Sequence, residues 1–124
     1  MIVRSYKRQN ISSLCAAAAA ALLLAAACGN GMDEHQRRGA AAIGRYGCGS
    51  CHTVKGVPGA NGLVGPPLTG VGSRQYIAGM LTNTPDNMAS WIYDPKAINP
   101  KTAMPKIGLS KQDAGDIAAY LHAQ

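Results

Sequence analysis

A stretch rich in glycine and proline in the middle of the chain limits what this sequence can fold into. Half of residues 57–72 are glycine or proline, which form neither a helix nor a central strand, because they add backbone freedom and remove amide donors. No segment shows the alternating pattern of a strand. With 124 residues the chain fits one small domain, and we predict an all-α fold of three to five short helices joined by long loops.

The first 27 residues have the order of a secretory signal peptide. Arg4, Lys7 and Arg8 precede an unbroken apolar run, residues 14–27, that closes on small side chains. The run is too short to span a bilayer comfortably, although a retained anchor that also uses the flanks of the run stays an alternative. Cleavage before Cys28 leaves 97 residues and lowers the net charge from +6 to +3, so we expect no nucleic-acid partner.

Cys28 stands where the cysteine of a bacterial lipoprotein signal stands. The sequence Leu-Ala-Ala-Ala-Cys resembles such a signal, in which the cysteine is lipidated and becomes the mature N-terminus, although residue 25 is Ala where Leu is usual. Ordinary cleavage that leaves a free thiol is the alternative. Residues 28–32 would then be a flexible tether to a domain spanning 33–124. We expect an exported protein on the periplasmic side of a bacterial membrane, either lipid-anchored or soluble.

Capping residues mark where the helices of this domain begin. Asp33 and Glu34 supply an acidic first turn, Thr84 and Pro85 form an N-cap and a first helical position, and Ser110 precedes Asp113 by three residues. The spacing of small and apolar residues predicts helices over 33–46, 72–80, 85–93 and from 110 to near the C-terminus. Pro95 ends the third helix, and residues 99–107 are predicted to form a loop.

The predicted domain has little apolar volume for its length. After the leader the chain holds four Tyr, one Trp and no Phe, and its loops contribute few large side chains. A covalently held, flat and apolar ligand would fill the centre of such a domain.

Cys48, Cys51 and His52 form a Cys-x-x-Cys-His motif that predicts such a ligand. Two thiols at this spacing reach the two vinyl groups of a haem on one helical turn, and the adjacent imidazole reaches the iron. A thioredoxin-like redox pair requires a βαβ context, and a zinc half-site requires two more ligands; the sequence supplies neither. We therefore predict one covalently attached haem c.

The sixth iron position decides whether the iron binds exogenous ligands or passes electrons. Met104 precedes Pro105 in the predicted 99–107 loop, and a residue before proline is held in extended geometry, which suits a thioether ligand. The other candidates are better explained as surface, tether or core residues: His35, His122, Met32, Met80 and Met88.

From Asp33 to Gln124 the chain resembles the class I cytochrome c family, in the order helix, Cys-x-x-Cys-His, proline loop, methionine loop, helix. The resemblance implies that Met104 is the distal ligand and that the Pro66 carbonyl accepts a hydrogen bond from His52. It also implies that Arg74 faces a haem propionate and that Trp91 lines the same edge. Without the resemblance, a solvated charge would be favoured for Arg74 and a core residue for Trp91. The chain is most similar to cytochrome c domains associated with haem-copper terminal oxidases.

The resemblance implies a single-haem electron carrier of a respiratory chain and not an enzyme. Its partner would be a membrane redox complex, such as a terminal oxidase, a quinol-oxidising complex or a dehydrogenase, reached through a lipid anchor or as a bound subunit. The basic residues from Lys55 to Lys111 form either a ring that steers an acidic partner or a scattered surface. The alternative function is a haem sensor or peroxidase-like protein with a labile sixth ligand.

Overall fold

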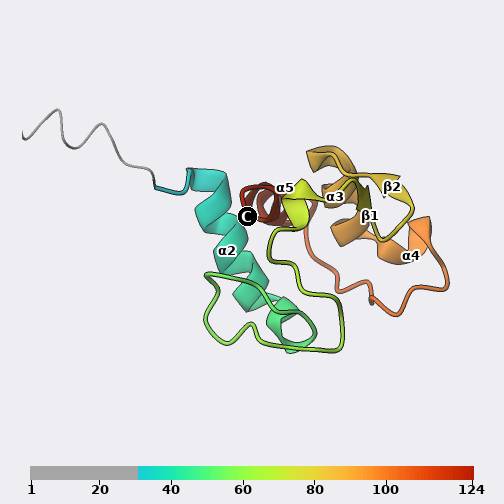
Figure 1. Ribbon diagram of the computed structural model, residues 1–124, viewed down its shortest axis with the longest axis horizontal. Coiled ribbons are helices and arrows are strands. Elements are labelled where there is room, and N and C mark those ends of the chain that lie inside the picture. Colours follow the sequence, from blue (N-terminus) through green and yellow to red (C-terminus); the bar gives the residue numbers. More distant parts are fainter. Residues whose placement is uncertain (1–30) are drawn as a thin grey trace, which may run out of the picture. The chain divides into compact units, whose positions relative to one another are not determined.

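The computed structural model of the protein describes residues 31–124 (Figure 1). The predicted signal peptide over 1–27 and Cys28 lie outside the described residues. Within 31–124 no helix is long and apolar enough to cross a membrane. The elements are α2 (Glu34–Arg45), η1 (Cys48–Ser50), η2 (Val71–Ser73), β1 (Tyr76–Ile77), β2 (Leu81–Thr82), α3 (Pro85–Tyr93), α4 (Pro95–Ile98) and α5 (Lys111–His122), where η marks a 3₁₀ turn.

Helix α2 begins at a capping box. The Asp33 carboxylate accepts a hydrogen bond of 2.8 Å from the Gln36 amide, and the Gln36 side chain accepts one of 3.1 Å from the Asp33 amide. At the other end Gly47 takes a left-handed conformation, with φ of 70°, that a residue with a side chain adopts only at a cost. The chain therefore leaves α2 sharply and starts the turn η1.

Helices α2 and α5 pack against each other (Figure 1), and Gly39 of α2 lies at their closest approach. A β-carbon at residue 39 would lie 2.0 Å from the Asp116 carbonyl oxygen and 2.9 Å from the Tyr120 β-carbon, so only glycine permits this approach. Ile43 and Ile117 are buried in the same core. The crossing thus holds the first and last helices together around one core.

Helix α3 packs against α5 through Met88 and Ile92, which are buried. Thr84 caps it with its side chain, and Pro85 occupies the first turn, as the sequence predicted. Asp94 follows the last residue of α3 and also caps α4, because its carboxylate accepts a hydrogen bond of 3.2 Å from the Ala97 amide. The prediction that α3 stops before Pro95 is right, but the short helix α4 was not predicted.

The predicted helix over 72–80 is wrong, and so is the expectation that no strand occurs. Strands β1 and β2 pair antiparallel there, with Ile77 opposite Leu81. Ala78 and Gly79, with φ of 51° and 70°, form the tight turn between them, in which the Ile77 carbonyl accepts from the Met80 amide at 2.9 Å. Strands of two residues are too short to show an alternating pattern in the sequence.

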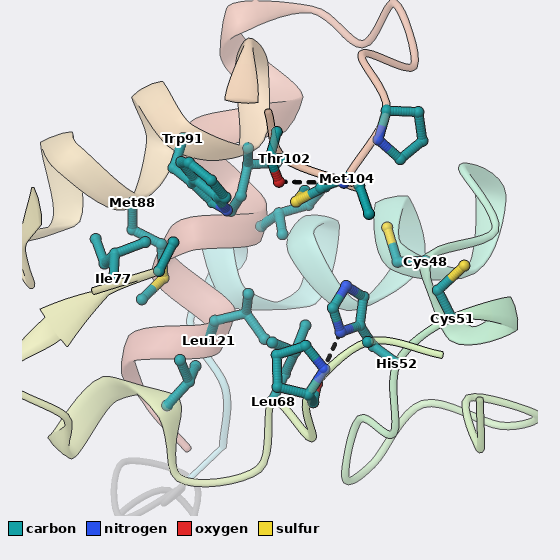
Figure 2. Close-up of a pocket in the computed structure, with 18 of the residues that line it drawn as sticks. Cys48, Cys51, His52, Leu68, Ile77, Met88, Trp91, Thr102, Met104 and Leu121 are labelled. Carbon is teal, nitrogen blue, oxygen red and sulfur yellow. Dashed lines mark hydrogen bonds between the residues drawn. The ribbon is translucent and has the colours of Figure 1, made fainter. Parts of the chain in front are cut away.

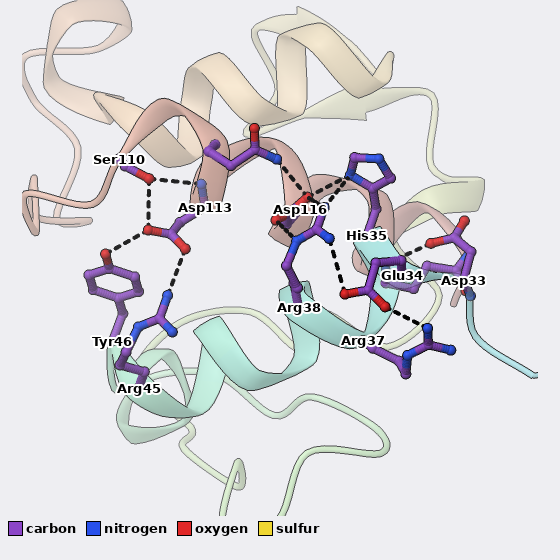
Figure 3. Close-up of polar contacts among 12 residues, drawn as sticks. Asp33, Glu34, His35, Arg37, Arg38, Arg45, Tyr46, Ser110, Asp113 and Asp116 are labelled. Atoms are coloured by element: carbon purple, nitrogen blue, oxygen red, sulfur yellow. Dashed lines mark hydrogen bonds and ion pairs between the residues drawn. The ribbon is translucent and has the colours of Figure 1, made fainter.

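A polar cluster joins α2 and α5 around Asp116 (Figure 3). Its carboxylate is only 2% exposed and accepts two hydrogen bonds from Arg38, at 2.7 and 3.1 Å, and one from Gln112 at 3.1 Å. Nδ1 of His35 lies 2.7 Å from the same carboxylate, although the His35 side chain is 61% exposed. Arg38 foremost, with His35 and Gln112, lowers the pKa of Asp116 to about 2 against the opposing effect of burial.

Candidate functional site

An apolar cavity of about 410 Å³ opens between the helices and the two long loops. Its walls come from several elements and both loops, including Ile43 of α2, Leu68 of the glycine- and proline-rich loop, Ile77 of β1, and Ile117 and Leu121 of α5. A cavity of this size and character suits a small, mostly apolar ligand held by a few polar groups. The shortage of large apolar side chains predicted from the sequence thus corresponds to an open space at the centre of the domain.

Cys48, Cys51 and His52 lie together on one side of the cavity (Figure 2). The turn η1 places them, because the amides of Cys51 and His52 both donate to the Cys48 carbonyl, at 3.2 and 3.0 Å. Both cysteines are half-buried and form no disulfide. Burial raises the pKa of the Cys48 thiol. This direction is opposite to the lowered pKa of an attacking redox cysteine.

The loop that follows His52 fixes the orientation of its ring. Nδ1 lies 2.7 Å from the Pro66 carbonyl oxygen, and because a carbonyl only accepts, Nδ1 carries the proton and donates it. In the neutral imidazole the other ring nitrogen, Nε2, then has the lone pair that can bind a metal. This is the contact that the family resemblance implied for Pro66.

Gly65 forms the surface against which the His52 ring lies. A β-carbon at residue 65 would stand 2.4 Å from Cε1 and 2.7 Å from Nδ1 of the imidazole. The Gly65 amide also donates to the Cys51 carbonyl at 2.7 Å, which ties this loop to the motif. The sequence analysis missed this residue, and its only signal was a glycine directly before the Pro66-Pro67 pair.

Met104 reaches into the cavity from the loop before α5, on the side opposite His52 (Figure 2). Its backbone amide donates to the Thr102 hydroxyl at 3.2 Å. Pro105 lies directly after it and also lines the cavity. The structure therefore places an imidazole nitrogen and a thioether on two sides of one apolar space.

The other candidate ligands lie elsewhere. Met32 and Met80 are 46% and 51% exposed. Met88 is buried, and Figure 2 places it beside Ile77 and away from His52. The expectation of a solvated His122 is wrong: it is half-buried, and its Nε2 has no hydrogen-bond partner among residues 31–124.

Arg74 and Trp91 line the same cavity. Trp91 is half-buried on α3, and Figure 2 shows it on the side of the cavity from which Met104 enters. Arg74 is exposed, and its guanidinium donates to the Pro67 carbonyl at 2.6 Å. The structure thus brings all the site residues predicted within its range to one cavity: Cys48, Cys51, His52, Pro66, Arg74, Trp91 and Met104.

This donor set fits a haem better than the alternatives. Two thiols, one imidazole and one thioether line a mostly apolar space, as a flat apolar macrocycle with a central metal requires. Between residues 31 and 124 no three His, Cys, Asp or Glu side chains converge as they would at a zinc site.

Comparison with known proteins agrees with this geometry. The family model for cytochrome c matches residues 36–124. Cytochrome c oxidase subunit 2 of Alkalihalophilus pseudofirmus is 36% identical to the chain over 77 residues, which are 61% of this chain and 22% of that protein. The chain therefore spans about a fifth of the length of that relative. No solved structure matches the chain.

The chain belongs to the cytochrome c family. The predicted all-α cytochrome c fold is confirmed at the level of fold class, with the small hairpin as an addition. A cytochrome c domain holds haem c covalently and transfers electrons, and members of the family are electron carriers and not enzymes in themselves.

Proposed function

We propose that this protein carries a single haem, attached through Cys48 and Cys51 and ligated by His52 and Met104, and passes electrons in a respiratory chain. The observation that supports this most is the entry of His52 and Met104 into one apolar cavity from two sides. When bound, the haem supplies an iron that takes up and releases one electron. A soft thioether such as Met104 favours the reduced form and raises the reduction potential.

Groups of the loop after the motif hold the His52 ring in one orientation. Pro66 fixes the His52 ring through its carbonyl, and Gly65 packs against the ring face. Ile43, Ile117 and Leu121 are buried and line the cavity with apolar side chains, which disfavour water there. Rigid ligands in a water-excluded site change little on electron transfer, so little reorganisation opposes it.

The partner that we propose is a membrane redox complex with an acidic docking surface, such as a terminal oxidase. Residues 31–124 carry nine Lys and Arg and six Asp and Glu. Four of the lysines and only one carboxylate, Asp94, lie in 94–111, so the rest of the described chain is neutral overall. All four lysines of this segment are exposed: Lys96, Lys101, Lys106 and Lys111. Net positive charge on the segment that carries Met104 would steer an acidic partner to it.

The similarity to part of an oxidase subunit supports the same class of partner. A quinol-oxidising complex or a dehydrogenase as electron donor is compatible with the same surface. The comparison covers only a part of that oxidase subunit, so the partner is inferred from charge and likeness together.

We further propose export to the periplasmic side of a bacterial membrane and lipid attachment at Cys28. The support is the basic start, the apolar run and the small residues that precede this cysteine. Labelling of the protein in cells with a radioactive fatty acid tests the attachment. The label should appear on the wild-type chain and be absent from Cys28→Ser, whereas an unlabelled wild-type chain would contradict it.

The mass of the purified protein tests the covalent haem. In a strain competent for cytochrome maturation, the wild-type chain should gain the mass of one haem that survives denaturation. Cys28→Ser is the matched control, because it removes a thiol outside the motif and should keep the haem. The variant with both Cys48→Ala and Cys51→Ala should lose it. A wild-type chain without this added mass would overturn the proposal.

A haem sensor or peroxidase-like protein is the alternative outcome. Such a protein would bind carbon monoxide in the ferrous state without any substitution, because its sixth position would be labile or open. The proposed carrier should bind carbon monoxide only after removal of the Met104 thioether.

A further inference from the structure

The loop that carries Met104 buries little of itself. Between Thr102 and Leu109 only Met104 is partly buried, and the other side chains are exposed. Ile107, the largest apolar side chain beside Met104 in this stretch, is 37% exposed. Apart from Met104 itself, apolar packing contributes little to holding residues 103–108, so polar contacts of this stretch matter more.

One carboxylate ties this loop to the end of α3. Asp94 follows the last residue of α3, and its carboxylate caps α4 through the Ala97 amide. Its second oxygen accepts a hydrogen bond of 2.5 Å from the ammonium of Lys106, two residues after Met104. The Asp94 side chain is 23% exposed, so this ion pair is partly shielded from water.

Two further contacts hold the Met104 loop against α3 and α4. The Lys106 ammonium lies 5.6 Å from the centre of the Tyr93 ring, in the residue directly before Asp94. On the other side of Met104, the Lys96 ammonium donates to the Thr102 carbonyl at 3.1 Å. The segment is thus tied to the end of α3 and to α4 both before and after Met104.

We propose that Asp94 is a positioning residue for Met104, an inference that rests on the proposed ligation of the haem by His52 and Met104. Its carboxylate restrains the loop against opening, because opening requires the Lys106 ammonium to leave it. Loss of the carboxylate charge leaves the global fold in place and increases the fraction of time in which Met104 is away from the cavity.

Cyanide binding to the ferric protein measures this opening, because cyanide takes the sixth position only when Met104 has left it. Asp94→Asn is the informative variant, since asparagine caps a helix as well as aspartate but carries no charge. We expect it to raise the rate of cyanide binding about two- to fivefold, the range that a partly exposed ion pair supports. Asp86→Asn, in the first turn of α3, is the matched control and should bind cyanide at the wild-type rate.

A double-mutant cycle separates the effect of the Asp94–Lys106 ion pair from the other effects of each substitution. Lys106→Gln should raise the rate by a similar factor, and the double variant should exceed neither single variant, because both remove one interaction. Circular dichroism of every variant should show the wild-type helix content. Equal rates in Asp94→Asn, Asp86→Asn and the wild type would overturn the role of Asp94, as would independent, multiplicative effects of the two single variants.

The wild-type spectrum distinguishes failure of this inference from failure of the proposed function. A ferric protein with a thioether ligand has a weak red absorption band. If the wild type shows the band and Asp94→Asn leaves the cyanide rate unchanged, only the role of Asp94 is overturned. If the wild type lacks the band, the assignment of Met104 fails and the role of Asp94 fails with it.

Discussion

Gly65 lies so close to His52 that a β-carbon at residue 65 would stand 2.4 Å from Cε1 of the imidazole. The same loop supplies the Pro66 carbonyl that accepts the proton of His52 Nδ1 at 2.7 Å. One face of the ring and one edge of the ring are therefore set by two consecutive residues. The side of the site that carries His52 therefore depends on the absence of a side chain at Gly65 as much as on the carbonyl of Pro66.

Gly65→Ala should displace the His52 ring and weaken its hydrogen bond to Pro66. We expect the free energy of unfolding of the haem-loaded protein to fall by about 1–3 kcal/mol, the usual effect of overpacking. Chemical denaturation followed by the haem absorption measures it. Gly115→Ala is a suitable control, because a β-carbon there meets nothing within 4 Å. A Gly65→Ala protein as stable as the wild type would contradict the proposed role of this glycine.

Gly39 and Gly44 make a matched pair within α2. Gly39→Ala should destabilise the protein by about 1–3 kcal/mol or more, because its β-carbon would meet the Asp116 backbone at 2.0 Å. Gly44→Ala should stabilise it by about 0.5–1 kcal/mol, since that position is open and alanine favours the helix. Thermal unfolding of both variants checks the prediction, and equal shifts of the two melting temperatures would contradict the observed crossing.

Asp116 should make the stability of the protein depend on acid. The pKa of this carboxyl falls from an ordinary 3.8 to about 2, chiefly through its hydrogen bond with Arg38. Its contribution is present above about pH 4 and is lost as the pH falls toward 2, because the unfolded chain binds the proton first. This linkage is worth about 2 kcal/mol.

Unfolding of the wild type and Asp116→Asn between pH 5 and about pH 2 measures this contribution. The variant should be less stable at neutral pH, because Arg38 loses a buried charged partner. The difference between the two proteins should narrow as the pH falls. A difference that stays constant over this range would contradict the assignment.

Charge reversal in segment 94–111 should slow electron transfer to an acidic oxidase. Lys101→Glu together with Lys111→Glu should lower the second-order rate of oxidation by roughly tenfold at low ionic strength. The effect should diminish as salt is added. Two charge reversals outside the segment, Lys55→Glu and Arg37→Glu, provide the control. Equal losses from both pairs would show that net charge, and not this surface, determines the rate.

The helices at the two ends of the domain could be predicted because their signals are local. Thr84 and Ser110 accept the expected backbone hydrogen bonds, and Asp33, predicted only as part of an acidic first turn, is itself an N-cap. The hairpin could not be predicted, since strands of two residues carry no period and the turn places Ala78 at positive φ. Helix α4 was hidden by Pro95, which is typical both of a helix stop and of a helix start.

Some residues of the site could likewise be predicted from local sequence patterns, and others could not. The Cys-x-x-Cys-His motif and the Met104-Pro105 pair are local patterns, and the structure brings them to one cavity. The proximity of Gly65 to His52 and the pairing of Asp94 with Lys106 depend on tertiary structure. Asp116 and His35 meet across 81 residues, so a histidine that the sequence suggested was a surface residue is exposed and also contacts a buried carboxylate.

The optical spectrum of the ferric protein, wild type and Met104→Ala, tests the central proposal most directly. The account predicts a haem spectrum with the weak red band of thioether ligation in the wild type. In Met104→Ala that band should be absent, the reduction potential lower, and the iron open to cyanide and carbon monoxide. A wild-type haem spectrum without the band, or a variant with the band and potential unchanged, would contradict the ligation of the iron by His52 and Met104.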